Sequence, residues 1–320
     1  MTTIASEESK TIFALNLLST PKEIIFWIPI VNQIKPMKNQ RTTFHAAVAI
    51  ALAALFTLSC SQDVPETNEP SISEDVLAQF EGMGFDIEGI QLVPNDNPLT
   101  GESGGFNYQL EGDIVISPAQ FEEMANSEIF HQGAVQEQYR TTNLVTGLPR
   151  TINVIGYTGG SFALTRKMRT ALQWTINNYN AINTNMTFTL TFGTNWQPYD
   201  IVVYKTNGSA GGSAGFPSGG DPYQFVQIFS GTNSYNTNVV EHVMTHEIGH
   251  CVGMRHTDYF NRSLSCGGSP INEGDAGVGA IHVPGTPTGF DPESVMLSCF
   301  SSSEDGEFGF FDIEALEFLY

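Results

Sequence analysis

Basic residues are scarce in this sequence. Its 320 residues include 13 lysines and arginines against 34 aspartates and glutamates, which gives a formal net charge of -21. A protein that grips nucleic acid needs a basic face for the phosphates, so we expect no nucleic-acid partner. The acidic excess reads as a solvated surface. The chain is long enough for one sizeable globular domain together with processed segments.

Apolar runs long enough for a permanent membrane helix are missing as well. The run from Ala46 to Ser59 has about 14 residues, and a spanning helix needs roughly 20. It follows the basic start M-K-N-Q-R, so we predict a lipoprotein-type signal peptide over residues 37–59. The T-L-S-C sequence loosely resembles a lipobox, which makes Cys60 the candidate lipidated residue. The alternative is an ordinary cysteine just past a conventional cleavage site. We interpret residues 1–36 as an upstream extension.

The low content of lysine and arginine, with abundant serine, threonine, asparagine and glycine, is typical of exported bacterial proteins. We therefore expect a monomer that is lipid-anchored to a bacterial outer membrane or cell surface, or secreted. Its only contact with a membrane would be the lipid. Residues 60–144 begin with the acidic, proline-bearing S-Q-D-V-P-E-T-N-E-P-S and are predicted to form a tether and a propeptide.

Regular structure is predicted most clearly over residues 145–320. Runs rich in β-branched residues indicate strands, and an apolar stripe with helical spacing indicates a helix. The order of elements indicates an α/β (α+β) fold, with a twisted sheet backed by a helix. Within this region the expected strands cover residues 151–157, 186–192, 200–204 and 223–229, and the expected helices cover residues 164–182, 238–253 and a stretch from Asp312. A short strand is also expected ahead of it, at residues 114–116.

One stretch, from His246 to His256, carries recognisable chemistry: H-E-I-G-H-C-V-G-M-R-H. His246 and His250 lie four apart on the predicted helix, so their imidazoles can share one tetrahedral zinc ion. Gly253 can take the positive φ that ends the helix and brings His256 up as third ligand. Glu247 suits a general base, because it can reach a metal-bound water without being a ligand. The alternative, histidines that only satisfy core hydrogen bonds, explains the pattern poorly.

This stretch matches the zinc signature of the metzincin endopeptidases, and H-E-I-G-H resembles most closely the bacterial dual-action HEIGH metallopeptidase family. Metzincins place a methionine-bearing turn beneath the metal, and S-V-M-L-S supplies Met296 for it. The resemblance implies a metzincin-like zincin with a twisted, mostly parallel sheet backed by a helix, an active-site helix, a methionine turn and a C-terminal helix. Residues 145–320 would be the catalytic domain. Ser298 stands where some metzincins carry a tyrosine, so no tyrosine ligand is expected.

The resemblance also implies a strand beside the cleft that pairs with an extended peptide substrate. The segment A-G-F-P-S-G-G resembles it, and its first residues, Ala214, Gly215 and Phe216, are the candidate substrate-binding residues. Such β-augmentation takes affinity from main-chain hydrogen bonds. The alternative is a mobile surface loop.

A further resemblance concerns control of the site. L-E-G-D-I-V, at residues 110–115, looks like the motif of astacin-type propeptides in which an aspartate occupies the open zinc position. Carried over, Asp113 would block the metal until the propeptide is cut. An ordinary turn before a strand explains the same residues. A cysteine switch is not expected, because Cys60 is the only cysteine ahead of the catalytic region.

The remaining cysteines, Cys251, Cys266 and Cys299, are an odd set, so we expect one disulfide and one buried thiol. Pairing of Cys251 with Cys299 and pairing of Cys266 with Cys299 are both open.

Three other residues have two readings each. His242, one turn before His246, either faces the cleft or is a solvated helix position. Asp258 and Glu273 are candidates for binding calcium or for adjusting the zinc site. The alternative is that both are exposed acidic residues in loops.

Together these features predict a secreted or surface-tethered zinc-dependent endopeptidase with one Zn²⁺ and with protein or peptide substrates. Two alternatives remain at this point. One is a surface-tethered zinc-fold binding protein or adhesin without activity. The other is a zinc hydrolase acting on a small molecule, which the extension from Gly253 to His256 disfavours.

Overall fold

The computed structural model describes residues 71–83, 85–101, 103–125, 138–272, 280–287 and 289–320. The predicted upstream extension, signal peptide and Cys60 lie outside these ranges, as does Glu273. No helix within the described ranges has the length and apolar character that crossing a membrane requires.

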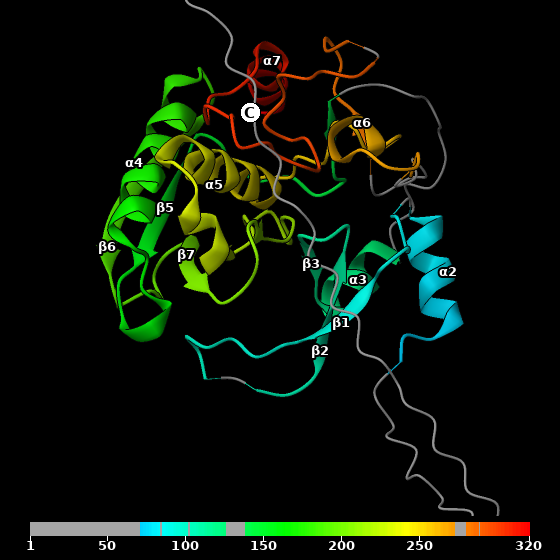
Figure 1. Cartoon of the computed structure of the whole chain (residues 1–320), viewed down its shortest axis with the longest axis horizontal. Helices are drawn as coiled ribbons and strands as arrows, with labels where there is room; N and C mark the ends of the chain where they lie inside the picture. Colours follow the sequence, from blue (N-terminus) through cyan, green and yellow to red (C-terminus); the bar gives the residue numbers. More distant parts are fainter. Residues whose placement is uncertain (1–70, 84, 102, 126–137, 273–279, 288) are drawn as a thin grey trace, which may run out of the picture. The chain divides into compact units, whose positions relative to one another are not determined.

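A five-stranded sheet organises the body of the protein (Figure 1). Its members are β6 (Met186–Gly193), β5 (Arg150–Tyr157), β7 (Ile201–Thr206), β9 (Phe225–Phe229) and β8 (Gly212–Ser213), in that spatial order. The first four strands run parallel, and β8 pairs antiparallel with β9. The first four residues of β7 are buried in succession, as expected for an internal parallel strand covered on both faces. The predicted mostly parallel sheet is confirmed.

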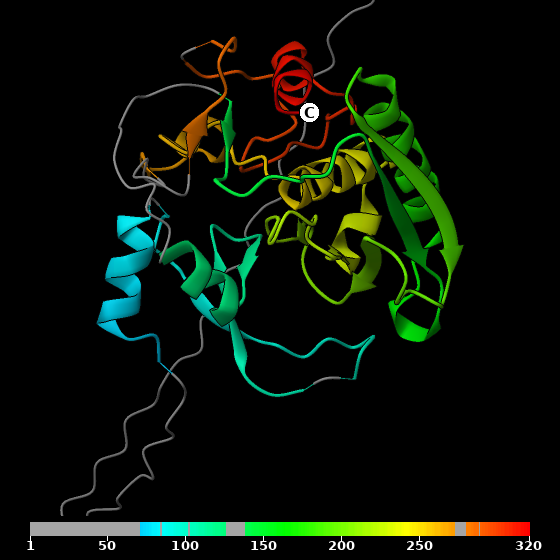
Figure 2. The ribbon, with the colours of Figure 1, turned by 180° about the vertical axis from the view of Figure 1, so that it is seen from behind.

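Two long helices pack beside this sheet, as Figure 2 shows from behind. In α4 (Arg166–Ala181) the Thr165 hydroxyl caps the first turn by accepting a hydrogen bond from Met168 N. In α5 (Thr237–Cys251) the side chain of Asn236 does the same for Val239 N. The predicted stripe of α4 is buried: Met168, Leu172, Ile176 and Tyr179. Every residue of α5 from Val239 to Cys251 is buried too, so its polar side chains point into the protein.

Residues 71–125 have a small fold of their own. Their elements are α2 (Glu74–Gly82), β1 (Gln91–Pro94), β2 (Phe106–Leu110), β3 (Ile114–Ile116) and α3 (Pro118–Ala125). The strands form an antiparallel sheet in the order β1-β2-β3. The apolar core of this unit includes Phe80 and Phe121 together with Phe216, which comes from the body of the protein.

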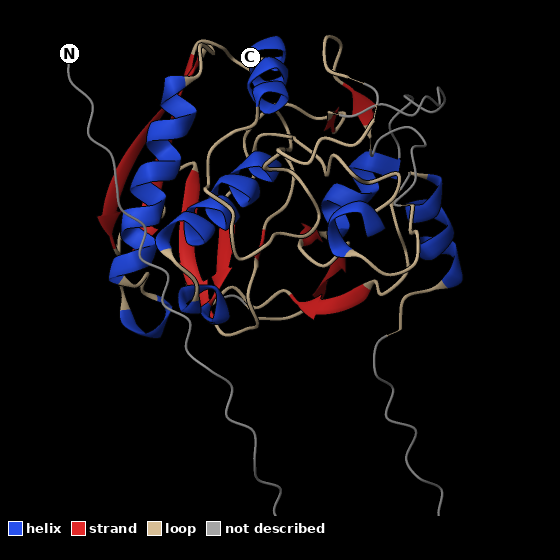
Figure 3. Cartoon of the chain, turned by 45° about the horizontal axis from the view of Figure 1, so that its top comes forward, coloured by secondary structure: helices blue, strands red, loops and turns tan. Residues whose placement is uncertain are grey.

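The C-terminal half adds short elements around α5, which Figure 3 shows among long loops. They are η2 (Ser230–Ser234), α6 (Ser263–Cys266), α7 (Phe310–Leu319) and a two-stranded pair of β4 (Tyr139–Arg140) with β10 (Ile281–His282); η1 (Gly160–Phe162) precedes α4. The C-terminal helix starts two residues earlier than the predicted Asp312. The reason is a cap: the Asp312 carboxylate accepts a hydrogen bond from Gly309 N at 2.9 Å.

Candidate metal centre

The chain turns sharply after α5, and this turn gathers the three histidines. Gly253 has φ 96°, as predicted, and a side chain there would lie 2.8 Å from Leu144 Cδ2. Met254 N donates back to the Gly249 carbonyl at 2.9 Å, which closes the turn. His256 is then brought against the helix, and its ring centroid lies 5.2 Å from that of His246.

Backbone carbonyls set the orientation of two imidazoles. The Nδ1 atom of His246 lies 2.9 Å from the Val295 carbonyl, and that of His250 lies 2.9 Å from the Met254 carbonyl. A carbonyl only accepts, so each Nδ1 carries the proton and each Nε2 keeps its lone pair. The two Nε2 atoms face one another at 3.0 Å. A shared cation stabilises such an arrangement.

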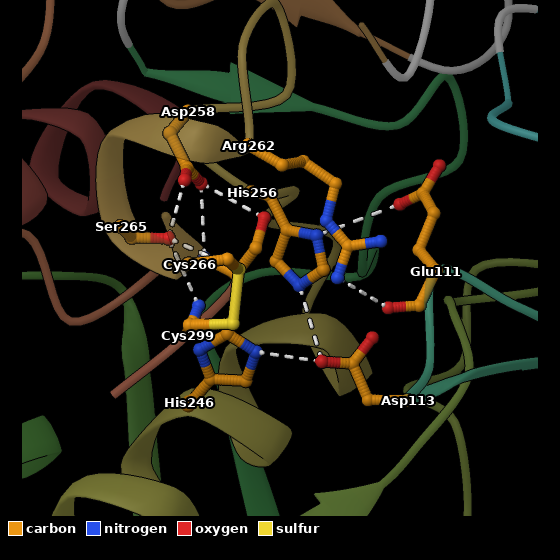
Figure 4. The surroundings of a disulfide bond; sticks show 10 residues. Glu111, Asp113, His246, His256, Asp258, Arg262, Ser265, Cys266 and Cys299 are labelled. Atoms are coloured by element: carbon orange, nitrogen blue, oxygen red, sulfur yellow. Dashed lines mark hydrogen bonds and ion pairs between the residues drawn. A yellow bond between two sulfur atoms is a disulfide. The ribbon is translucent and has the colours of Figure 1, made fainter. Parts of the chain in front are cut away.

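Asp113 completes the cluster from the turn between β2 and β3 (Figure 4). Its Oδ2 lies 3.2 Å from His256 Nε2 and 3.5 Å from His246 Nε2. The ligand atoms of Asp113 and the three histidines all lie within 4.8 Å of one another. Burial acts to raise the pKa of Asp113, but the imidazoles of His256 and His246 outweigh it and hold that pKa well below its usual range.

The chemistry of the donors fits a zinc ion. Two buried carboxylate oxygens, Glu247 Oε2 and Asp113 Oδ1, have no hydrogen-bond partner among the described residues. Burial, reinforced by the charge of Asp113, raises the pKa of Glu247 well above its ordinary value. Burial also lowers the pKa of His250, which favours the neutral form that binds metals. A divalent cation among these groups would compensate the buried carboxylates, and three imidazoles with one carboxylate are a ligand set that zinc accepts.

The predicted methionine turn lies beneath the histidines. Met296 is fully buried, and a Cβ added to Gly249 of α5 would lie only 2.5 Å from its Sδ. Val295, whose carbonyl orients His246, donates its N–H to Asp312 Oδ2 at 2.7 Å. The first turn of α7 therefore supports the methionine turn, which in turn orients a histidine. Sequence reasoning had assigned Asp312 only a helix start.

Asp258 supports the other side of the same turn. Its Oδ1 accepts hydrogen bonds from Ser298 N at 2.9 Å and from Ser298 Oγ at 2.8 Å, while its Oδ2 accepts one from Ser265 Oγ at 2.5 Å. It is fully buried, so the reading as an exposed loop acid is wrong. Its role toward calcium stays a prediction.

The cysteines behave as one disulfide and one buried thiol. Cys266 and Cys299 are bonded, and Cys251 is a buried free thiol. Of the two pairings left open by the sequence, the structure selects the one that ties α6 to the loop after Met296.

The candidate substrate-binding residues are buried by the N-terminal unit. Ala214 N donates to the Asp113 carbonyl at 3.0 Å, and Val115 N donates to the Ala214 carbonyl at 2.7 Å. At Gly215 an added Cβ would lie 2.5 Å from the Val115 carbonyl, and Phe216 packs into the core of residues 71–125. The reading of this segment as a mobile surface loop is therefore wrong in this form of the protein.

A cavity of about 260 Å³ adjoins the cluster. Its lining includes His242, Val243, His246, Glu247, Arg262 and the loop from Leu297 to Phe300. His242 is buried, and this burial, reinforced by His246, lowers its pKa to about 4. Of its two readings, the one that turns it toward the cleft is confirmed. The solvated reading failed because α5 is buried on all sides.

Sequence reasoning missed an ion pair between the two halves of the site. The fully buried Arg255 pairs its guanidinium with the Glu111 carboxylate, and its Cζ lies 4.6 Å from the centroid of the Phe85 ring. Arg262 Nη2 donates to the Glu111 carbonyl at 2.9 Å. The available signal was a charged residue directly before the ligand His256, in a chain with few basic residues.

Comparison with known proteins identifies the class. The family model described as "Dual-action HEIGH metallo-peptidase" matches residues 108–320, which is more than half of the chain. The chain belongs to this family. The HEIGH metallopeptidase assignment makes it a zinc metalloprotease with a metzincin-like fold, and the expected enzyme class is confirmed. The match begins ahead of Asp113, so it includes the turn that carries this residue.

Two solved structures are similar to this chain at low sequence identity. A structure titled "Structure of Myroilysin" matches at 13% identity, over 55% of this chain and 82% of that chain, with a TM-score of 0.35. A second, titled "Crystal structure of myroilysin", matches at 14% identity, over 56% and 86%, with the same TM-score of 0.35. No curated protein matches.

Proposed function

We propose that the chain is an exported zinc endopeptidase that residues 71–125 keep latent, with Asp113 in the fourth coordination position of the zinc. The observation that carries the proposal is the cluster of four ligand atoms within 4.8 Å of one another, three from the catalytic motif and one from the N-terminal unit. A catalytic zinc site keeps one position open for water or substrate. Asp113 fills that position from outside the motif.

In the active form each residue of the site has its own role. When bound by His246, His250 and His256, zinc would supply a water nucleophile at neutral pH and polarise the scissile carbonyl. Glu247 takes the proton of the attacking water and passes it to the leaving amine. His246 and His250 stay oriented through their Nδ1 hydrogen bonds to backbone carbonyls. Met296 supports the site from below without reacting.

The contacts of residues 71–125 with the active site explain the proposed latency. Their turn at Asp113 reaches the histidines, and β3 continues along Ala214, where an extended substrate would pair. The same residues therefore cover both the metal position and the substrate edge. Removal of residues 71–125 would free both together.

The boundary of the catalytic body lies ahead of residue 138 in this proposal. Gln138 Nε2 donates to Asp312 Oδ1 at 2.9 Å, Arg255 N donates to the Tyr139 carbonyl at 2.8 Å, and Thr141 N donates to the Gly253 carbonyl at 2.8 Å. These residues stabilise the turn that carries His256. A cut at 144/145 would remove them, whereas a cut between residues 125 and 138 spares them.

The cellular setting is proposed on the sequence alone. Residues 37–59 act as the signal peptide, Cys60 carries the lipid, and the acidic stretch after it tethers the uncut, latent chain to a bacterial surface. A cut between residues 125 and 138 separates the active enzyme from this tether. The substrates are proteins or peptides, and the enzyme works as a monomer.

One experiment tests both activity and latency. The intact zinc-loaded chain and the chain cut by limited proteolysis are each incubated with a proteome-derived peptide library, with and without a zinc chelator. We expect cleavage only by the cut chain, and only without the chelator. Cleavage at the same rate with and without the chelator would overturn the zinc mechanism. Equal cleavage by the intact and the cut chain would overturn the role of Asp113.

A further inference from the structure

We infer that the place held by Glu111 is a substrate subsite for an acidic side chain, in which Arg255 binds the carboxylate and Arg262 binds the main-chain carbonyl. The inference rests on the proposed function and adds a substrate class to it. Arg255 lies in the catalytic motif and Arg262 in the loop after it, whereas Glu111 lies in residues 71–125, which are proposed to leave.

The contacts at Glu111 are those of a residue recognised at two points. Its carboxylate forms a fully buried ion pair with Arg255, and its Oε2 lies 3.5 Å from His256 Nδ1. Its carbonyl accepts the hydrogen bond from Arg262 Nη2 at 2.9 Å, beside Asp113 in Figure 4. Glu111 also has φ 56°, a conformation that costs a non-glycine residue energy and persists only where the surroundings fix it.

Glu111 lies on the line that a substrate would follow. Two residues further along, the Asp113 carboxylate lies against the histidines. Its carbonyl and Val115 N then pair with Ala214, on the edge where peptide substrates are proposed to bind. A peptide that lies along the same edge and reaches the zinc therefore passes the guanidinium groups that now hold Glu111.

Both arginines are held by parts of the chain that stay when residues 71–125 leave. Arg255 N donates to the Tyr139 carbonyl at 2.8 Å, and Arg262 N donates to the Ile271 carbonyl at 2.8 Å. Their backbones therefore keep their positions, and a carboxylate from a substrate can replace that of Glu111.

The charges of the enzyme confine the preference for an acidic side chain to this one subsite. Residues 138–320, which remain after the proposed cut, carry 8 lysines and arginines against 15 aspartates and glutamates, so at long range they repel acidic peptides. Two arginines that meet at one residue reverse this repulsion locally. We therefore expect an acidic residue two to three positions from the scissile bond, on one side only.

The first test is the sequence pattern of the cuts. The full chain is loaded with zinc, cut by limited proteolysis and used without separating the fragments on a proteome-derived peptide library. The variants are Arg255→Gln and Arg262→Gln, and the matched control is Arg166→Gln, on the exposed start of α4. Wild type and control should enrich aspartate and glutamate at one position by about tenfold over glutamine, and Arg255→Gln should lose this enrichment.

The second test measures binding and needs no catalytic activity. The cut Glu247→Ala chain is titrated with a fluorescent peptide of sequence LEGDIV and with the same peptide carrying glutamine in place of its glutamate. Binding of the glutamine peptide should be at least about tenfold weaker. This comparison needs no arginine variant to fold.

Each outcome decides the matter. One-sided acidic enrichment with weaker binding of the glutamine peptide supports the subsite. Chelator-sensitive cleavage without acidic enrichment, enrichment on both sides, or equal binding of the two peptides overturns the subsite and leaves the proposed function standing. Absence of chelator-sensitive cleavage overturns both.

Discussion

Gly249 offers a sharp test of how the methionine turn supports the active-site helix. A Cβ at this position would lie 2.5 Å from Met296 Sδ and 3.2 Å from Met296 Cε. In an isolated helix, Gly→Ala is favourable by about 1 kcal/mol. Overpacking a filled core costs roughly 1–3 kcal/mol, so Gly249→Ala should be neutral or destabilising by up to about 2 kcal/mol.

The matched control is Gly193→Ala in β6. There an added Cβ meets only Ile155 Cδ1 at an ordinary 3.7 Å, and φ is not positive. This change should stabilise the protein by roughly 0.5–1 kcal/mol, because alanine loses less conformational entropy on folding. The difference between the two variants, about 0.5–3 kcal/mol, reports the cost of moving Met296.

Calorimetry and zinc titration provide the assays. Each kcal/mol corresponds to roughly 2–4 °C in Tm for a protein of 150–250 residues, so Gly249→Ala should melt several degrees below Gly193→Ala. A displaced Met296 also shifts Val295, whose carbonyl orients His246, and losing such support costs about 10–100-fold in zinc affinity. Gly249→Ala with the stability gain of the control and unchanged zinc affinity would refute the role given to the methionine turn.

Two further changes test the surroundings of the site. Replacing Cys266 and Cys299 with serine should cost about 2–4 kcal/mol, because the bond closes a loop with a sequence separation of 33; a calorimetric difference from wild type that persists in strong reductant would contradict this. Burial, reinforced by Glu307, raises the pKa of Glu241 from 4.5 to about 7, so its contribution to stability is complete below 4.5 and lost as the pH rises through 7. Glu241→Gln should therefore gain stability relative to wild type at pH 8 compared with pH 4, and denaturant titrations with parallel pH profiles would count against this reasoning.

The sequence predicted those features that depend on residues close together in the chain. His246 and His250 share a helix face because of their spacing, and Gly253 permits the turn to His256 because glycine alone adopts that φ readily. The four parallel strands of the sheet followed from runs of β-branched and aromatic residues, whereas the short β8 was not predicted. Met296 and Asp113 came from resemblance, and the structure brings both to the histidines.

Features that depend on distant contacts were not predictable. The pair of Glu111 with Arg255 joins residues 144 apart in the sequence, and nothing local marks a partner at that separation. The disulfide had two possible pairings because the sequence does not say whether Cys251 or Cys266 lies next to Cys299 in the fold. His242 had two readings because its burial depends on what surrounds α5, which the sequence of the helix alone does not reveal.

Glu247→Ala in the cut, zinc-loaded chain tests the central claim most directly. The measurement combines zinc content per chain with the rate of cleavage of the peptide library. We predict one zinc per chain, as in wild type, and a rate indistinguishable from that with chelator. Retained zinc together with cleavage at the wild-type rate would contradict the assignment of Glu247 as general base and the account built on it.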